Sequence, residues 1–244
     1  MTTRVAVVTG GGSGIGRATC TRLTADGFTL AVLDVDGEAA KVAAGPDGLG
    51  CAADVADRHA VDAAFGHVVE AFGRIDVLVN NAGVSGTVDA TVCHETTVEE
   101  WDRVLAINTR GPFLCARAAL PVMLAQGDGH IITVASVAGQ VAFPGRCAYT
   151  ASKGAALMFA KSLAADYAAA GIRSNAVCPG FVRTPMTQWR LDVPELREQV
   201  EARIPTGRVA EPDDIADAIA VLASGRMGYM TGAALVVDGG WTVL

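Results

Sequence analysis

Val5-Ala6-Val7-Val8-Thr9-Gly10-Gly11-Gly12-Ser13-Gly14-Ile15-Gly16 places a short apolar run directly before a glycine-rich turn. Such a run is typical of a strand buried on both faces, and a helical pattern starts near Gly14. The glycines follow the spacing T-G-x-x-x-G-x-G, because Arg17 stands where a strict G-x-G-x-x-G needs its last glycine. Glycines here let the backbone approach a pyrophosphate, and the helix N-terminus offers it free N–H groups. The segment predicts a nucleotide site in preference to a plain strand-to-helix turn.

The rest of the chain repeats this alternation of short apolar runs and longer helical patterns. Strands are expected at 5–9, 29–34, 50–52, 77–80, 130–135, 173–177 and 234–237. Helices are expected near 14–26, 38–44, 58–72, 97–125, 148–170 and 212–224. Alternating elements of this kind form right-handed βαβ units, so the pattern predicts an α/β fold with a parallel sheet covered on both faces.

We expect residues 1–244 to form a single nucleotide-binding and catalytic domain, because no linker or second composition zone interrupts the chain. The alternation of strand and helix patterns is interrupted only between Pro179 and Pro205, where a helical stretch near 193–202 is flanked by turn residues. We interpret 185–205 as an insertion that forms a mobile flap over the site, with a plain surface excursion as the alternative.

The composition excludes several classes of protein. Hydrophobic residues make up 51% of the 244 residues and charged residues 18%, which is typical of a globular chain. The net charge of −7, without a basic cluster, argues against a nucleic-acid partner. Because the N-terminus lacks a signal-peptide pattern and the apolar runs are too short to span a bilayer, we predict a cytoplasmic protein without a membrane partner.

The metal-binding residue types form no ligand pattern. The six cysteines contain no C-x-x-C pair, so we expect reduced thiols and no zinc or redox site. The four histidines form no H-x-x-x-H pair, so we predict no metal site. We expect all four at the surface or in loops: His59, His67, His94 and His130.

Asp34 closes the second predicted strand, twenty residues after Gly14. In a dinucleotide-binding fold a carboxylate at this place binds the adenosine ribose hydroxyls. It repels a 2′-phosphate, and no Lys or Arg stands at 12, 13, 33 or 35 to attract one. Asp34 therefore favours NAD over NADP.

Tyr149 and Lys153 lie four residues apart where a helical pattern begins, with Ser136 thirteen residues upstream of Tyr149. Residues at this spacing share one helix face, roughly 6 Å apart. A nearby cation lowers the pKa of a phenol, so Tyr149 could exchange a proton with an alcohol oxygen held by Ser136. Because the spacing alone arises often by chance, this interpretation depends on the nucleotide site.

These motifs and their order resemble the short-chain dehydrogenase/reductase family across essentially the whole chain. The matching motifs are Thr9-Gly10-x-x-x-Gly14-x-Gly16, Asp54-Val55, Asn80-Asn81-Ala82-Gly83, Asn108, Ser136, Tyr149-x-x-x-Lys153 and Pro179-Gly180. The resemblance implies a three-layer Rossmann fold with a seven-stranded parallel sheet in the order 3-2-1-4-5-6-7. It also implies a homotetramer, with contacts through 97–125, 148–170 and 234–244.

The resemblance implies catalytic roles for four residues. Tyr149 would be the acid/base, Lys153 would lower its pKa and bind the nicotinamide ribose, and Ser136 would polarise the substrate oxygen. Asn108 would anchor a water in a proton relay through Lys153. Ala135 departs from the many members that carry a second serine there, without affecting the mechanism.

Binding residues follow from the same resemblance. The implied cofactor site comprises Gly10, Ser13, Gly14, Ile15, Gly16, Asp34, Asp54, Val55, Asn81, Ala82, Gly83, Tyr149, Lys153, Pro179, Gly180, Val182 and Thr184. The implied substrate site comprises Ser136, Gln140, Val141, Tyr149, Met186 and Trp189, with Val84, Ser85, Val137 and Phe143 nearby. This set has no cluster of Arg or Lys, so we expect a neutral secondary alcohol or ketone.

The predicted function is an NAD-dependent oxidoreductase that interconverts a secondary alcohol and a ketone, with Tyr149 as acid/base. One alternative is a 3-oxoacyl-(acyl-carrier-protein) reductase-like enzyme, which would use NADPH. A non-catalytic nucleotide-binding protein is a further alternative, because a fold alone does not establish turnover.

Overall fold

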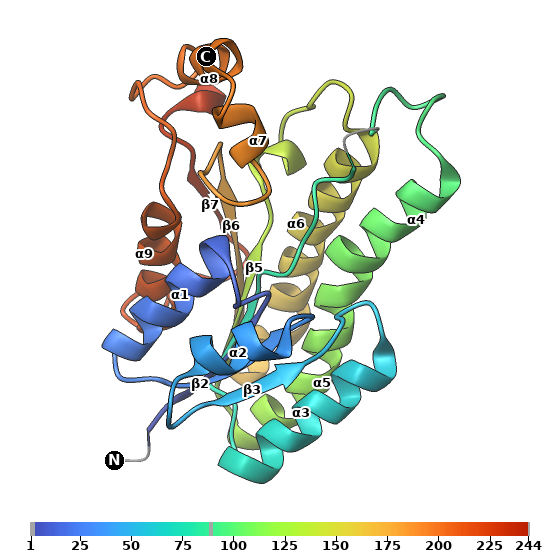
Figure 1. The fold of residues 1–244 in the computed structure, drawn as a ribbon. Helices are drawn as coiled ribbons and strands as arrows, with labels where there is room; N and C mark the ends of the chain where they lie inside the picture. Colours follow the sequence, from blue (N-terminus) through green and yellow to red (C-terminus); the bar gives the residue numbers. More distant parts are fainter. Residues whose placement is uncertain (1–2, 88–89, 244) are drawn as a thin grey trace.

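One parallel sheet forms the centre of the computed structural model, which describes residues 3–87 and 90–243 (Figure 1). Within these residues the sheet has seven strands in the order β3-β2-β1-β4-β5-β6-β7, and every neighbouring pair is parallel. The predicted sheet and its strand order are confirmed. The strands are β1 (Val5–Thr9), β2 (Thr29–Asp34), β3 (Leu49–Ala52), β4 (Val77–Asn80), β5 (Gly129–Val134), β6 (Ile172–Pro179) and β7 (Ala234–Val237).

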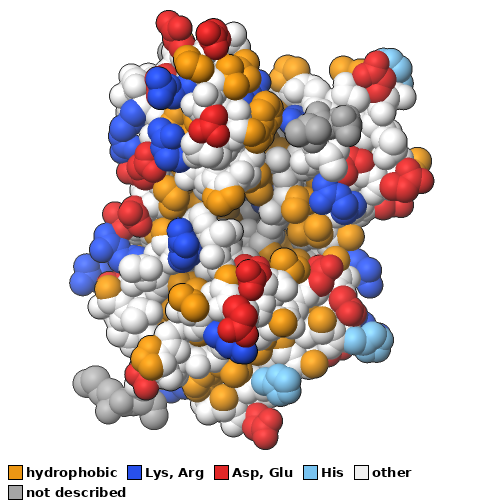
Figure 2. All heavy atoms as spheres, viewed as in Figure 1, with side chains coloured by type: hydrophobic (Ala, Val, Ile, Leu, Met, Phe, Trp, Pro, Cys, Tyr) orange, Lys and Arg blue, Asp and Glu red, His pale blue; other side chains and the backbone are white. Residues whose placement is uncertain are grey.

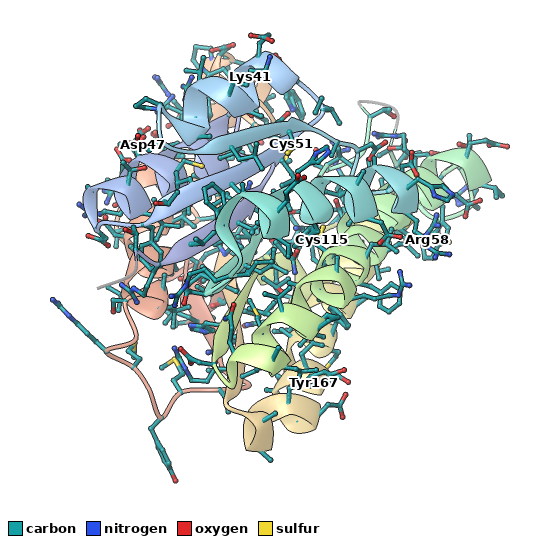
Figure 3. All side chains as sticks on the ribbon, turned by 90° about the horizontal axis from the view of Figure 1, so that it is seen from below. Lys41, Asp47, Cys51, Arg58, Cys115 and Tyr167 are labelled. Carbon is teal, nitrogen blue, oxygen red and sulfur yellow. The ribbon has the colours of Figure 1, made fainter. Side chains whose placement is uncertain are left out.

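Helices cover both faces of the sheet and complete the three layers (Figure 1). One face is covered by α1 (Gly14–Ala25), α2 (Gly37–Ala44) and α9 (Pro212–Ala223), which share a buried apolar cluster with the strands. The other is covered by α3 (Arg58–Phe72), α5 (Gly111–Gln126) and α6 (Cys147–Tyr167). Cys115 of α5 lies within this second cluster, between helices and sheet in the view from below (Figure 3).

The single helix predicted over 97–125 is interrupted. The structure has α4 (Val98–Leu105), a π-helical turn (Ala106–Arg110) and then α5. Pro112 stands in the first turn of α5; it lacks an N–H and its ring clashes with the preceding turn, so the backbone widens just before it. The widened turn contains Asn108, and it places this residue differently from an unbroken helix.

The segment predicted as an insertion contains two short helices, α7 (Gln188–Leu191) and α8 (Pro194–Glu201). Its apolar side chains pack on Trp241 near the end of the chain, in a small cluster formed by Leu191, Val200, Ile204, Val209 and Trp241. The second helix matches the helical stretch expected near 193–202. The division into one domain with an insertion at 185–205 stays a prediction.

His130 corrects the expectation that all four histidines lie at the surface or in loops. It lies on β5, is 2% exposed, and its Nε2 accepts a hydrogen bond from Asn175 Nδ2 at 2.9 Å. Its Nδ1 then donates to the Leu222 carbonyl at 3.1 Å. Burial, reinforced by the charge of Arg173, lowers the pKa of His130 to about 3. The imidazole is tolerated inside because both ring nitrogens have partners.

The described part of the chain has neither a membrane-spanning helix nor a cluster of metal-ligating side chains. None of the helices in 3–87 and 90–243 is long and apolar enough to cross a membrane. The same residues contain no group of three or more His, Cys, Asp or Glu that could hold a metal ion. Leu244, which ends the expected C-terminal subunit contact, lies outside the described residues.

Candidate active site

A cavity of about 390 Å³ opens at the carboxyl ends of the strands. Figure 2 shows the molecule hollowed between the segment that carries α7 and α8 and the side that carries α4. Ligands bind at this edge of a parallel sheet. The cavity brings together these predicted residues: Gly10, Ser13, Gly14, Ile15, Asp34, Asp54, Val55, Asn81, Ala82, Gly83, Ser136, Tyr149, Lys153, Pro179, Gly180, Val182, Thr184 and Met186.

The glycine-rich turn packs against the turn after β4. Gly10 has a positive φ of 63°, and a Cβ there would lie 2.8 Å from Ala82 Cα. Asn81 Nδ2 donates to the carbonyls of Thr9 and Gly10 at 2.9 and 3.0 Å, so its side chain holds the turn in place. Gly16 lies behind the turn, where a Cβ would strike the Gly10 carbonyl oxygen. Gly16 therefore shapes the site without lining it.

The N-terminus of α1 meets this cavity without a side-chain cap. Its N-cap residue, Ser13, makes no capping hydrogen bond, whereas α2, α3 and α4 are capped by the side chains of Asp36, Asp57 and Thr97. An uncapped helix start offers its free N–H groups and positive dipole to an anion. The turn therefore fits the pyrophosphate of a dinucleotide.

The Asp34 carboxylate is fixed at the end of β2. Its Oδ2 accepts a hydrogen bond from the Gly12 N–H at 2.8 Å, and its Oδ1 accepts one from the Asp36 N–H at 3.1 Å. The cavity wall around it includes Asp54 and Val55. In the lining formed by the described residues, Lys153 is the only Lys or Arg, so Asp34 faces the cavity without a basic neighbour in the wall.

Ser136 and Tyr149 meet across the catalytic end of the cavity. The Ser136 hydroxyl accepts from the Ala138 N–H at 3.0 Å and hydrogen-bonds the Tyr149 phenol. Burial raises the pKa of Tyr149, while the Ser136 hydrogen bond lowers it, and burial outweighs the hydrogen bond. The pKa of Tyr149 is thus raised in this structure, because desolvation disfavours phenolate more strongly than the Ser136 hydrogen bond favours it. The lowering expected from Lys153 stays a prediction.

Lys153 is buried beneath Tyr149. Its Nζ donates to the Val134 carbonyl at 2.9 Å and lies 5.8 Å from the centre of the Tyr149 ring. Burial lowers the pKa of Lys153 to about 8. The predicted proximity of the ammonium and the phenol is present, but the cation is held by the strand and not by the phenol oxygen.

Asn108 links the π-helical turn to the turn after β4. Its Oδ1 accepts from the Val84 N–H at 2.9 Å, and its Nδ2 donates to the Val84 carbonyl at 2.8 Å and to Ser152 Oγ at 3.0 Å. A Cβ on Gly83 would lie 3.2 Å from Asn108 Oδ1 and 3.4 Å from Lys153 Nζ. Asn108 is thus near Lys153, with its side chain committed to the Val84 backbone.

The predicted substrate residues divide into two groups. Met186 lines the cavity and is 39% exposed. The cavity lining formed by the described residues does not include Gln140, Val141 or Trp189. The side chain of Gln140 hydrogen-bonds the Cys178 thiol. Phe143 stacks on Trp241 at 5.9 Å between ring centres, so it anchors the α7–α8 segment.

One arginine outside the predicted substrate residues lies close to Tyr149. Arg146 precedes α6 and lines a smaller hollow with Ser85 and Tyr149. Arg190 lies on α7. Burial lowers the pKa of Arg146, and the charge of Arg190, which stands far along the chain, lowers it further. No sequence spacing links residues that far apart.

The cavity wall also contains residues that no motif in the sequence marks. Several of them stand next to a predicted residue in the sequence. This adjacency is the only signal that could have indicated them. They are Leu33, Val35, Ala53, Ile107, Val134, Ala135, Pro185 and Thr187.

The parallel sheet, the glycine-rich turn and the Ser136–Tyr149–Lys153 group define a Rossmann-type oxidoreductase. A family model described as Enoyl-(Acyl carrier protein) reductase matches residues 10–242. The chain belongs to the short-chain dehydrogenase/reductase family and is an oxidoreductase acting on CH–OH groups.

Known relatives match the full length of the chain. The 2-(R)-hydroxypropyl-CoM dehydrogenase of Xanthobacter autotrophicus is 53% identical, with 99% of each chain covered. The 3-oxoacyl-[acyl-carrier-protein] reductase FabG of Staphylococcus aureus is 39% identical over 98% of each chain. The crystal structure of gox2181 superimposes with a TM-score of 0.95 at 35% identity, covering 100% of this chain and 97% of that one.

Proposed function

We propose that the protein is an NAD-dependent dehydrogenase that interconverts a small secondary alcohol and its ketone. The observation that carries this proposal is the contact between Ser136 and Tyr149 in the same cavity as the Asp34 carboxylate. A proton-transfer group and a nucleotide-binding edge in one cavity are what an alcohol dehydrogenase requires.

The chain's own residues perform the proton chemistry. Bound NAD would supply hydride acceptance or donation at its nicotinamide ring. Tyr149 donates its phenol proton in reduction, and its phenolate form takes the hydroxyl proton in oxidation, while the Ser136 hydroxyl orients the substrate oxygen. Lys153 places a positive charge near the Tyr149 ring, and so favours the phenolate as the proton leaves. Asn108, close to Lys153, would hold a water of the proton path through Oδ1, which accepts from the Val84 N–H and has a second lone pair.

The remaining predicted residues would hold the cofactor. Gly10, Ser13, Gly14 and Ile15 would bind the pyrophosphate, and Asp54 and Val55 the adenine. Val182 and Thr184 would contact the nicotinamide carboxamide. Asp34 would accept hydrogen bonds from the ribose hydroxyls and repel a 2′-phosphate, which supports NAD over NADP.

The full-length relative with 53% identity supports a 2-hydroxyalkyl substrate, because its name gives 2-hydroxypropyl-CoM as the compound it oxidises. Met186 would contact the substrate from the α7–α8 segment. The rival reading, an acyl-carrier-protein reductase that uses NADPH, is supported by the relative at 39% identity. The Asp34 carboxylate disfavours it. The chain has Ser136, Tyr149 and Lys153, and this argues against the alternative of a non-catalytic nucleotide-binding protein.

We further propose a homotetramer in the cytoplasm. Large apolar side chains are exposed on the helices expected at subunit contacts: Trp101, Phe113, Leu124 and Met158. The six cysteines are all unpaired, which fits a reducing compartment. Light scattering of the purified protein tests the assembly, and a monomeric mass would contradict it.

An activity screen tests the proposed function. Purified protein is mixed with NAD or NADP and a panel of secondary alcohols, including 2-hydroxypropyl-CoM, and the reduced nicotinamide is followed by absorbance. We expect turnover with NAD and a much lower kcat/KM with NADP. A strong preference for NADPH in reduction of acyl-carrier-protein thioesters would instead support the reductase.

A further inference from the structure

One buried hydroxyl, that of Ser152, ties the catalytic part of α6 to the π-helical turn at Ala106–Arg110. Ser152 stands directly before Lys153 in the sequence and is 0% exposed. Its Oγ donates to the Tyr149 carbonyl at 2.7 Å and accepts from Asn108 Nδ2 at 3.0 Å. A single side chain thus joins the two segments that carry the proton-transfer residues.

The directions of these hydrogen bonds are fixed by their partners. A serine hydroxyl has one proton, and the Tyr149 carbonyl accepts it, so the bond from Asn108 uses an Oγ lone pair. Asn108 Oδ1 accepts from the Val84 N–H at 2.9 Å, and its Nδ2 donates to the Val84 carbonyl at 2.8 Å. Both Nδ2 protons are therefore used, one by Val84 and one by Ser152, while Oδ1 keeps a lone pair for a further donor.

This lone pair belongs to an atom that lies near the Lys153 ammonium. A Cβ on Gly83 would be 3.2 Å from Asn108 Oδ1 and 3.4 Å from Lys153 Nζ, so both atoms border the same small space. The ammonium is held independently, by its hydrogen bond to the Val134 carbonyl. A displacement of Asn108 would therefore separate Oδ1 from the ammonium without moving the ammonium.

The π-helical turn restrains this part of α6 through the same residue a second time. Thr109 Oγ1 donates to the Ser152 carbonyl at 3.4 Å, next to the bond from Asn108. As far as the described residues show, the N-cap residue of α6, Arg146, makes no side-chain capping hydrogen bond. Loss of the Ser152 hydroxyl would leave one buried Asn108 N–H without an acceptor, which is unfavourable, so the amide would turn toward another partner.

We propose that Ser152 is a positioning residue for proton transfer, which holds Asn108 in a fixed place relative to Tyr149 and Lys153. This inference rests on the proposed function, because it concerns the proton path of the same site. In ketone reduction the phenol gives its proton to the substrate oxygen, and the phenolate that remains regains a proton from solvent. With Asn108 Oδ1 in place, a water on that path has an acceptor beside Lys153.

The test is Ser152→Ala, assayed with NADH and a ketone that the wild type reduces. We expect kcat to fall about 10- to 100-fold, because a small misplacement along the proton path is costly. NADH binding measured by fluorescence and KM for the ketone should change less than about threefold. The ratio of kcat in H₂O to kcat in D₂O should rise, because proton delivery then limits turnover.

The matched control is Ser162→Ala, which removes the same group from an exposed position of α6, where its Oγ donates to Asp166. It should leave kcat and the solvent isotope effect unchanged. Ser152→Cys occupies similar space but forms only weak hydrogen bonds, so it should lose kcat as Ser152→Ala does. This variant takes the place of Ser152→Ala if that protein does not bind NADH.

A double-mutant cycle separates positioning from a general structural role. In the Asn108→Ala background Ser152→Ala should lower kcat less than about threefold, because the group that Ser152 positions is already gone. A purely structural loss would add in full to the loss caused by Asn108→Ala.

The outcomes distinguish the two proposals. The positioning role is overturned, while the dehydrogenase stands, if Ser152→Ala keeps kcat within about threefold of wild type. It is also overturned if the solvent isotope effect does not rise or if the two losses add in full. If a wild-type protein that binds NADH reduces no ketone and oxidises no secondary alcohol in the panel, the proposed function itself fails.

Discussion

The Lys153 ammonium donates a hydrogen bond to the Val134 carbonyl at 2.9 Å, which fixes a buried cation of α6 on the end of β5. This bond keeps the charge near the Tyr149 ring without using the phenol oxygen. The phenol oxygen therefore stays available to Ser136 and to a substrate.

Ketone reduction should lose efficiency above about pH 8. Burial lowers the pKa of Lys153 to about 8, so the cation that stabilises the phenolate left by proton donation is present below that pH and lost above it. The pKa of Tyr149 is raised, so the phenol keeps its proton across this range. The measurement is kcat/KM for ketone reduction against pH, with a plateau below about pH 8 and a decline above it. A constant value up to about pH 10 would refute the role given to Lys153.

Asp34→Asn should relax cofactor selectivity without disturbing the glycine-rich turn. The amide oxygen can still accept the Gly12 N–H, but the charge that repels a 2′-phosphate is gone. We expect the ratio of kcat/KM for NAD to that for NADP to fall at least about tenfold. Asp36→Asn, two residues away in the capping position of α2, is the control and should leave the ratio unchanged. Equal ratios in wild type and Asp34→Asn would remove the argument for NAD.

His130 should make the protein sensitive to acid. Its folded-state pKa is about 3, against an ordinary value of 6.5, so between these values the unfolded chain binds a proton that the folded protein does not. Stability is then lost as pH falls through this window, by up to about 1.4 kcal/mol per pH unit.

Urea unfolding at several pH values measures this effect. His130→Gln lacks the titrating group, so its stability should fall less steeply than that of the wild type between about pH 6.5 and about pH 5. His59→Gln, at an exposed position of α3, is the control. Parallel slopes in wild type and His130→Gln would show that the buried imidazole does not govern acid sensitivity.

Most of the fold and the nucleotide edge could be predicted from sequence because their signals are local. The apolar runs of the strands are short and continuous, and the turn from Gly10 to Gly16 directly follows the first of them. Tyr149 and Lys153 share one helix, so their separation follows from helix geometry. The resemblance to the family added Asp54 and Thr184, which line the same cavity.

Features that depend on packing between distant segments were missed. Arg146 lines a hollow with Ser85 only because segments far apart in the sequence pack together, and no periodicity encodes that arrangement. The effect of burial on Tyr149 depends on neighbours from several elements, so the sign of its pKa shift could not be derived from the nearby lysine alone. The burial of His130 was missed because its partners, Asn175 and Leu222, come from other elements.

The most direct test of the central claim is Tyr149→Phe, which removes one hydroxyl and leaves the ring. With an alcohol that the wild type oxidises with NAD, we expect kcat to fall by about 10²- to 10⁴-fold, while NADH binding and the thermal unfolding midpoint stay near wild type. Turnover within about threefold of wild type by a folded, NADH-binding Tyr149→Phe protein would contradict the account, because another group would then have to exchange the proton.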